Sequence, residues 1–262
     1  MKTKTTILIA FLVLAIVRIH AQENYRIDEL GKNFWRIQAV QGTLSTAYLI
    51  LGSRQALVID ACTGQEGFKE AVRKLAGTTP VTLALTHGHM DHSGGVKYFD
   101  KVYVHKADTN LMPMGSRNKW VFFDEGFMFD LGDQKIEILS IPGHTPGSVA
   151  FYNRKGRYML TGDGIGSTSV WAHISNDPLT VFLSTLKRLE AMKGDIDRIY
   201  VGHHEQEEKA PLTTQYITDM RIATEKVLDG SIETKPYENS FRSGMQATYG
   251  SATLVFNPDK LR

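Results

Sequence analysis

Residues 86–95 read Thr-His-Gly-His-Met-Asp-His-Ser-Gly-Gly and place three histidines and one aspartate within six positions. The apolar run 81–85 directly before them predicts a buried strand that ends where the histidines begin. Side chains at this spacing cannot share one face of a helix, so the backbone must turn between them, and the glycines of the stretch permit such a turn. Four nitrogen and oxygen ligands exceed the three protein ligands that a catalytic zinc usually keeps. The stretch therefore predicts a metal-binding loop that can serve two ions, with the candidate ligands His87, His89, Asp91 and His92.

The composition is that of a globular chain, with 262 residues, of which 42% are hydrophobic and 22% charged. The first residues differ, because Lys2 and Lys4 precede the apolar run 7–17 in the pattern of a secretory signal peptide. A membrane-spanning helix would need about 20 apolar residues, and Arg18 interrupts this run. We expect residues 1–21 to be a signal peptide cleaved near Ala21. Residues 22–262 are then expected to form a single domain, periplasmic or secreted, without stable membrane insertion.

The charge and the cysteine content exclude some classes of partner and bond. Loss of residues 1–21 removes three basic residues and no acid, so the formal charge moves from +2 to −1. No basic cluster then remains to neutralise phosphates, and we expect no nucleic-acid partner. Cys62 is the only cysteine, so no intramolecular disulfide can form, and we interpret it as a small buried hydrophobe. A small-molecule substrate is the expected partner, and the oligomeric state stays open.

The apolar patterns predict a chain rich in strands, with a few helices that cover them. Strands are expected at residues 33–40, 45–51, 56–60, 101–105, 135–141, 157–161, 198–201 and 251–256, and helices at 65–76, 178–193 and 211–228. Asp177 is the expected N-cap of the second helix, because a proline follows it. Segment 112–129 is expected to be a loose loop.

Four further motifs lie at the ends of strands or in turns. They are Asp60 at the end of strand 56–60, Gly-His-Thr-Pro-Gly-Ser at 143–148, Gly-Asp-Gly at 162–164 and Gly-His-His at 202–204. Together with His-x-His-x-Asp-His at 87–92, they resemble the motifs of the metallo-β-lactamase superfamily in identity and in order, over about residues 42–203. The resemblance implies an α/β fold, an αββα sandwich of two mixed sheets flanked by helices.

The resemblance also implies a ligand set. The first metal would be held by His87, His89 and His144, the second by Asp91, His92 and His203, and Asp163 would bridge the two. His204 remains an alternative to His203, because neighbouring residues at a strand end face opposite ways. Asp60, Thr145 and Ser148 would orient the ligands from behind through hydrogen bonds, although Asp60 could instead be an acid at a helix N-terminus.

By the same resemblance the chain is expected to be an exported hydrolase with two zinc ions, iron or manganese being alternatives. A metal-bridging hydroxide would attack an ester, lactone, thioester or related carbonyl, because a metal-bound water has its pKa lowered from 15.7 to about 7. Asp91 would take or relay a proton. The alternatives are a metallo-β-lactamase that cleaves β-lactam amides, a phosphodiesterase, a mono-iron persulfide dioxygenase and a non-catalytic zinc module.

Differences from the motifs of related subfamilies make some of these activities less expected. His89 stands where di-iron flavoproteins of similar fold carry a glutamate, and Cys62 is not placed to serve as the second-site cysteine of the commonest β-lactamases. Glyoxalase II-type thioesterases share the ligands but carry a C-terminal helical domain, whereas only one or two helices are expected here after His203.

Aromatic residues close to the motifs suggest a substrate wall. Trp120, Phe122 and Phe123 precede the 143–148 motif, and Trp171 and His173 follow Asp163. They predict an apolar or aromatic pocket. A packed cluster of hydrophobic loop residues is the alternative interpretation, because aromatic side chains are ordinary core material.

Overall fold

The structure is a computed structural model, and it describes residues 24–166, 169–172, 175–204, 210–239 and 243–262. The expected signal peptide, residues 1–21, lies outside the described residues. Within the described ranges, no helix is long and apolar enough to cross a membrane.

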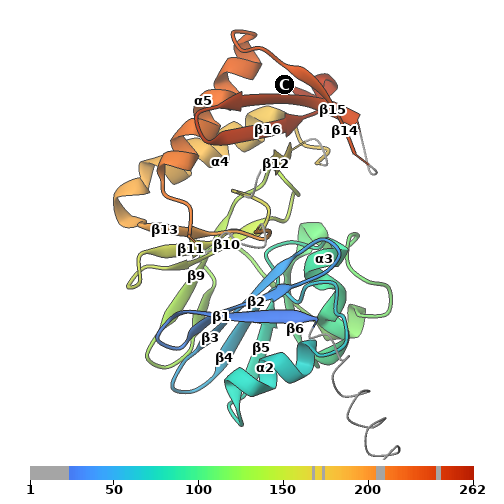
Figure 1. Ribbon diagram of the computed structural model, residues 1–262, viewed down its shortest axis with the longest axis vertical. Coiled ribbons are helices and arrows are strands. Elements are labelled where there is room, and N and C mark those ends of the chain that lie inside the picture. The colour runs from blue at the N-terminus through green and yellow to red at the C-terminus, as the bar shows by residue number, and fades with distance from the viewer. Residues whose placement is uncertain (1–23, 167–168, 173–174, 205–209, 240–242) are drawn as a thin grey trace, which may run out of the picture.

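The N-terminal part forms a seven-stranded sheet whose strands lie in chain order (Figure 1). The strands are β1 (Tyr25–Gly31), β2 (Phe34–Ala39), β3 (Thr46–Leu51), β4 (Ala56–Ile59), β5 (Val81–Ala84), β6 (Val102–His105) and β7 (Trp120–Phe123). Strands β1 to β4 pair antiparallel, and β4 to β7 pair parallel. The parallel pairs need crossovers, and helices α2 (Phe68–Ala76) and α3 (Met90–Ser93) lie in the first two of them.

A second sheet of five strands has the order β13-β11-β10-β9-β8. Its strands are β8 (Met128–Asp130), β9 (Lys135–Ser140), β10 (Val149–Asn153), β11 (Tyr158–Leu160) and β13 (Arg198–Tyr200). All neighbours are antiparallel except β11 and β13, which are joined through helix α4 (Leu179–Ala191). The segment expected as a loose loop therefore contains two strands, β7 and most of β8. Each is the last strand at an edge of its sheet and pairs with a single neighbour. These two strands therefore form because of contacts with other parts of the sheet and not because of a local sequence pattern.

Alternation along the strands divides the apolar residues between two cores. Leu49 of β3 packs against α2, whereas its neighbours Tyr48 and Ile50 pack in the core shared with the second sheet. In β10, Phe151 lies in that shared core and Tyr152 lies in the core under α4. The side chains of successive residues point to opposite faces, so both sheets are buried on two sides. The predicted αββα sandwich is confirmed.

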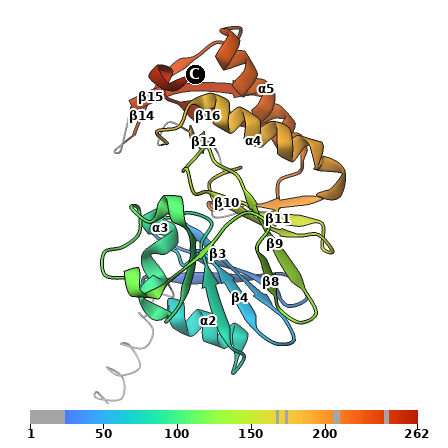
Figure 2. The same cartoon turned by 180° about the vertical axis from the view of Figure 1, so that it is seen from behind.

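A third sheet, with the order β12-β16-β15-β14, was not expected. Its strands are β12 (Val170–Trp171), β14 (Lys235–Glu238), β15 (Ser243–Tyr249) and β16 (Ala252–Phe256). Helices α4 and α5 (Gln215–Asp229) lie between it and the second sheet (Figures 1 and 2). Leu254 of β16 and Met220 of α5 belong to the same core as Tyr152 of β10, so this sheet extends the hydrophobic interior of the sandwich.

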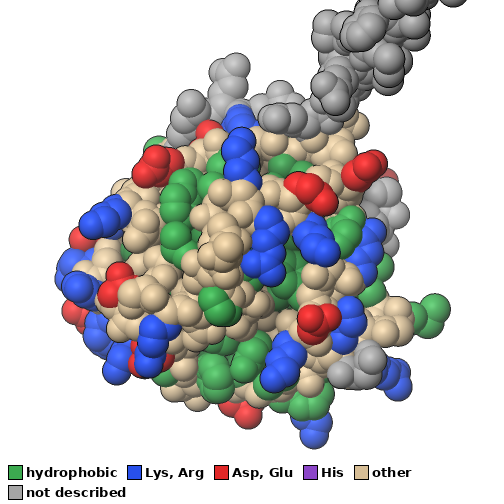
Figure 3. Space-filling model, turned by 90° about the horizontal axis from the view of Figure 1, so that it is seen from below, with side chains coloured by type: hydrophobic (Ala, Val, Ile, Leu, Met, Phe, Trp, Pro, Cys, Tyr) green, Lys and Arg blue, Asp and Glu red, His purple; other side chains and the backbone are tan. Residues whose placement is uncertain are grey.

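The short helices are 3-10 turns, namely η1 (Gly94–Tyr98), η2 (Lys106–Asp108), η3 (Arg117–Lys119), η5 (Lys193–Asp195) and η6 (Pro258–Lys260). Two helix starts differ from expectation, because Pro178 rather than Asp177 is the N-cap of α4 and α5 begins at Gln215 rather than at residue 211. Figure 3 shows basic and acidic side chains interspersed over one face of the molecule.

Candidate metal centre

The candidate ligands follow the carboxyl ends of four strands. Strand β5 leads into a turn with His87 and His89 and then into helix α3, which carries Asp91 and His92. Strand β9 leads to His144, β11 to Asp163 and β13 to His203. The ends of the two facing sheets therefore bring segments from distant parts of the chain together. Three overlapping groups have ligand atoms that all lie within 4.8 Å of one another. They are His87 with His89 and His144, His87 with His92 and Asp163, and Asp91 with His92 and His203.

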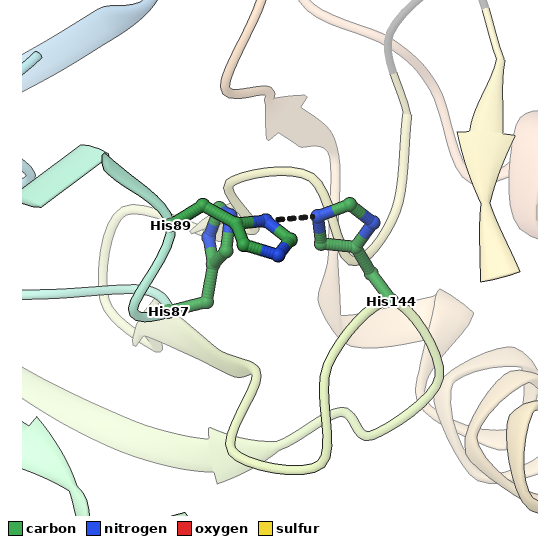
Figure 4. A group of neighbouring side chains, drawn as sticks. All are labelled: His87, His89 and His144. Atoms are coloured by element: carbon green, nitrogen blue, oxygen red, sulfur yellow. Dashed lines mark hydrogen bonds between the residues drawn. The ribbon is translucent and has the colours of Figure 1, made fainter. Parts of the chain in front are cut away.

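The first group is formed by three histidine rings that face one another (Figure 4). The Nδ1 atom of His89 lies 3.0 Å from Nε2 of His144. The Nε2 atom of His87 is buried and has no hydrogen-bond partner among the described residues. Burial lowers the pKa of His144 to about 4 and that of His87 well below its usual value. These rings are therefore neutral at neutral pH.

The other two groups contain the carboxylates of Asp163 and Asp91. The Nε2 atom of His203 lies 3.3 Å from Oδ2 of Asp91 and 3.3 Å from Oδ2 of Asp163, and Nε2 of His92 lies 3.3 Å from Oδ1 of Asp163. Although burial opposes the shift, Asp163 raises the pKa of His203 to about 10. Burial likewise opposes a lower pKa at Asp91, but its hydrogen bond with His203 and the charge of His92 lower it to about 2. The two carboxylates thus favour a positive charge between them.

Protein groups hold four of the five rings from behind. The Nδ1 atom of His144 donates to the carbonyl oxygen of Trp171 (3.0 Å), and that of His203 donates to the carbonyl oxygen of Thr43 (2.8 Å). The Nδ1 atoms of His92 and His87 lie 2.8 Å from Oδ2 of Asp60 and 3.0 Å from Oγ1 of Thr86. Carbonyl and carboxylate oxygens only accept, and the Thr86 hydroxyl gives its proton to Asp60, so Nδ1 of each of these rings carries a proton and Nε2 is the nitrogen that faces the interior.

This arrangement fits a divalent metal. The Nε2 atoms of His92 and His203 lie 3.3 Å apart, and each also lies 3.3 Å from an oxygen of Asp163. Ligands 2.0–2.1 Å from a tetrahedral zinc are about 3.4 Å apart. Nitrogen and carboxylate oxygen are also the donor types that zinc takes, and His87 Nε2 is a buried donor atom without a partner.

Asp60 contacts two parts of the metal loop. Its Oδ1 accepts from the backbone N–H of Thr86 (2.7 Å), and its Oδ2 accepts from the Thr86 hydroxyl and from His92. Its φ of 63° is rare for a residue other than glycine. A strained backbone that is maintained by three hydrogen bonds is typical of a position whose side-chain direction matters.

His204 faces away from the groups. The Tyr48 hydroxyl donates to the carbonyl oxygen of Val201 (2.7 Å) and therefore accepts from Nε2 of His204 (3.1 Å). Burial lowers the pKa of His204 to about 3. The structure therefore brings His203, and not His204, to the other candidate ligands.

The expected orienting residues Thr145 and Ser148 lie in one network. The Thr145 backbone N–H donates to Ser148 Oγ (3.1 Å), and the two hydroxyl oxygens lie 2.7 Å apart. The Thr145 hydroxyl also donates to Asp108 Oδ2 (2.7 Å). Asp108 was not singled out in the sequence, because no spacing links it to the metal motifs.

The aromatic residues that were expected to line the substrate pocket lie in different parts of the structure. Trp120 packs against the core behind the first sheet, Phe123 is buried, and Phe122 is 50% exposed on the edge strand β7. Among the described wall residues, Trp171 is the one that contacts the first histidine group, through its carbonyl oxygen. Its ring lies 6.0 Å from that of Tyr237 in β14. His173 lies outside the described residues.

Comparison with protein-family models shows the family of this chain. A family model described as the metallo-beta-lactamase superfamily matches residues 40–203. This chain belongs to the metallo-β-lactamase superfamily. The match covers four of the motifs in full and reaches His203 of the fifth, so the family predicted from them is confirmed.

Similar proteins of the superfamily include hydrolases of thioesters. The acyl-coenzyme A thioesterase MBLAC2 of Gallus gallus is 25% identical over 228 residues, which cover 70% of this chain and 82% of that protein. The hydroxyacylglutathione hydrolase of Brucella anthropi is 31% identical over 146 residues, or 54% of each chain. A metallo-beta-lactamase from Pontibacter korlensis superposes with a TM-score of 0.62 at 16% identity, covering 76% of this chain and 97% of that one, which shows the fold alone. The chain is a metal-dependent hydrolase, and its cluster of histidine and aspartate side chains is suited to a divalent metal.

Proposed function

We propose that this protein is an exported thioester hydrolase that works with two zinc ions. The observation that carries the proposal is the convergence of seven side chains into three overlapping groups, with Asp163 Oδ2 3.7 Å from His144 Nε2 and 3.3 Å from His203 Nε2. The proteins similar to this chain include an acyl-coenzyme A thioesterase and a hydroxyacylglutathione hydrolase. Those two proteins differ in the thiol that their substrates carry. The bond between a carbonyl carbon and sulfur is what their substrates share.

The metals would be held by side chains of both sheets. His87, His89 and His144 would hold the first ion, and Asp91, His92 and His203 the second. The carboxylate of Asp163 reaches both groups, because its Oδ2 lies 3.7 Å from His144 Nε2 and 3.3 Å from His203 Nε2. His89 would bind through Nδ1, which faces His144, and the other four histidines through Nε2. When bound, such ions supply a water whose pKa falls to about 7 and a positive charge beside the substrate carbonyl.

The proposed substrate has a leaving group that needs no proton. The Nδ1 protons of four of the rings are held by protein acceptors. A thiol has an ordinary pKa of about 8.5 and leaves readily as a thiolate, whereas an amine must be protonated to leave. The carboxylate of Asp91 suits holding a cation, and its role in proton relay stays a prediction.

The test is a comparison of initial rates on four substrates by the zinc-loaded protein. An acyl thioester, an acyl lactone, a β-lactam and a phosphodiester are offered at equal concentration. We expect thioester hydrolysis far above the rate of His87→Ala, which removes a ligand. Thr253→Ala is the control, because Thr253 lies in β16, outside the groups, and its hydroxyl contacts that of Thr248 (3.0 Å).

Any other result of this comparison would assign a different activity to the protein. Preferential turnover of the β-lactam, the lactone or the phosphodiester would replace the thioesterase proposal with that activity. One iron per chain, with oxygen consumption on a persulfide, would point to the dioxygenase instead. Metal analysis of the purified protein separates zinc from iron and manganese.

Export is proposed from the first residues alone. Lys2 and Lys4 before the apolar run 7–17 support it. We expect the protein recovered outside the cytoplasm to begin at Gln22 by N-terminal mass analysis. Intact Met1 in a cytoplasmic fraction would contradict export without affecting the hydrolase proposal.

A further inference from the structure

A buried carboxylate outside the ligand groups joins the two loops of the first histidine group. Asp108 ends η2 (Lys106–Asp108), just after β6, and it has no exposed surface. Its Oδ2 accepts from the backbone N–H of Gly88 (2.9 Å) and from the Thr145 hydroxyl (2.7 Å), and its Oδ1 accepts from the backbone N–H of Gly147 (2.7 Å). Gly88 lies between two of the candidate ligands, and Thr145 directly follows the third.

The packing around Asp108 explains two glycines of the motifs. A Cβ atom on Gly147 would lie 2.6 Å from Cγ of Asp108, and one on Gly88 would lie 2.6 Å from its carbonyl oxygen. Neither glycine has a positive φ, so their backbone conformations do not require glycine. Close approach to Asp108 requires it, and the 86–95 and 143–148 motifs are in this respect built around that residue.

Three hydrogen bonds from the two loops compensate the buried carboxylate of Asp108. Among the described residues, no lysine or arginine forms an ion pair with it, so three hydrogen-bond donors from the two loops compensate the carboxylate. Hydrogen bonds to a charged acceptor are stronger than neutral ones, and a buried charge that loses them is costly. The two loops are therefore held at a fixed distance by one side chain.

We propose that Asp108 is a positioning residue that sets the separation of His89 and His144 and thereby the affinity of the first metal site. The two rings approach to 3.0 Å between His89 Nδ1 and His144 Nε2. Gly88 precedes His89, and Thr145 follows His144, so a change at Asp108 moves both rings. The inference rests on the proposed ligand role of these histidines and is independent of the proposed substrate.

The decisive variant is Asp108→Asn, which keeps the shape of the side chain. An amide offers one acceptor oxygen and turns its NH2 group toward one side. Either the Gly147 N–H or the pair formed by the Gly88 N–H and the Thr145 hydroxyl then faces a donor. At least one loop must move, whichever way the amide is oriented.

The matched control is Asp219→Asn in α5. Asp219 is also buried and accepts three hydrogen bonds, from the Gln215 side chain and from the backbone N–H and hydroxyl of Ser251, each at 2.8 Å. It joins α5 to the turn between β15 and β16, outside the metal groups. A general loss from replacing a buried carboxylate will appear in both variants, and only a positioning effect will be confined to Asp108.

The measurement is zinc affinity by competition with a chromophoric chelator, accompanied by the visible spectrum of the cobalt-loaded protein and by thermal unfolding of the metal-free protein. In Asp108→Asn, we expect zinc to bind the site formed by His87, His89 and His144 roughly 10- to 100-fold more weakly than in wild type. We also expect the cobalt spectrum of this variant to change. Asp219→Asn should keep the wild-type affinity and spectrum. Equal zinc affinity in wild type and in Asp108→Asn would overturn the inference.

A second variant decides the matter if Asp108→Asn does not fold. Thr145→Val removes one of the three donors and leaves the carboxylate in place. A weaker first zinc site in this variant supports the inference, and an unchanged one overturns it. Because these readouts use no substrate, normal zinc binding with no thioester turnover would defeat the proposed function alone. A wild-type chain that binds no zinc would defeat both.

Discussion

The orientation of each histidine ring is set by an acceptor behind it. Thr43 and Trp171 offer backbone carbonyl oxygens, and Asp60 offers a carboxylate, to the Nδ1 atoms of His203, His144 and His92. Such partners raise the basicity of the inward nitrogen and fix the ring. A metal site that depends on these contacts is sensitive to changes that do not touch any ligand.

The neighbouring histidines 203 and 204 should respond to substitution in opposite ways. His203→Ala is expected to lose the second metal and to leave stability little changed, because its ring is partly exposed. His204→Ala should keep both metals but lower the free energy of unfolding by about 1–3 kcal/mol, since the Tyr48 hydroxyl loses a buried partner. Zinc content and urea denaturation of the two variants test this. Loss of zinc in His204→Ala alone would assign the last ligand to His204.

The identities of the converging residues could be predicted from the sequence, but the ring nitrogens could not. The spacing of His87, His89 and His92 marks a metal loop by itself. His89 faces inward with Nδ1 because His144 lies on that side of its ring. The separation of these two rings depends on Asp108, and no local sequence pattern marks that residue. Contacts between side chains and distant backbone carbonyls have no sequence signature.

At the scale of elements, strands with clear apolar runs were predictable, including the edge strand β13, whereas the edge strands β1 and β14 and the interior strand β15 were not. β3 and β4 have continuous apolar runs, whereas β14 contains Pro236 and has largely exposed side chains. β14 forms only because β15 offers it an antiparallel partner. The same third sheet includes β12, where Trp171 pairs with Val255 of β16, so it borders the metal centre.

A substitution in β16 tests how much this sheet supports the fold. Leu254 has no exposed surface and packs in the core under α5. Leu254→Ala should lower the free energy of unfolding by about 2–5 kcal/mol through the cavity that it leaves. Thr253→Ala is the control, because its hydroxyl lies 3.0 Å from that of the exposed Thr248 and is not part of the core. Equal urea midpoints for the two variants would show that the third sheet contributes little to the core.

At the scale of the whole molecule, the site exists only when both sheets are assembled. Its ligands follow strands β5, β9, β11 and β13, which belong to two sheets. The unfolded chain therefore has no equivalent site, and metal binding must stabilise the folded state.

Removal of the metal should lower thermal stability. At a free zinc concentration of 100 times Kd, binding contributes about 2.7 kcal/mol, which corresponds to a Tm shift of roughly 5–10 °C for a chain of this size. We expect a chelator to cause this loss in wild type and a smaller one in His87→Ala. A Tm that is independent of chelator would mean that the folded chain does not bind the metal tightly.

Anomalous diffraction at the zinc absorption edge, from crystals of the zinc-loaded protein, tests the central claim most directly. Two peaks are expected, one bound by His87, His89 and His144 and the other by Asp91, His92 and His203, with Asp163 between them. A single peak, or peaks that contact other side chains, would contradict the account of a two-metal centre formed by the ends of the two sheets.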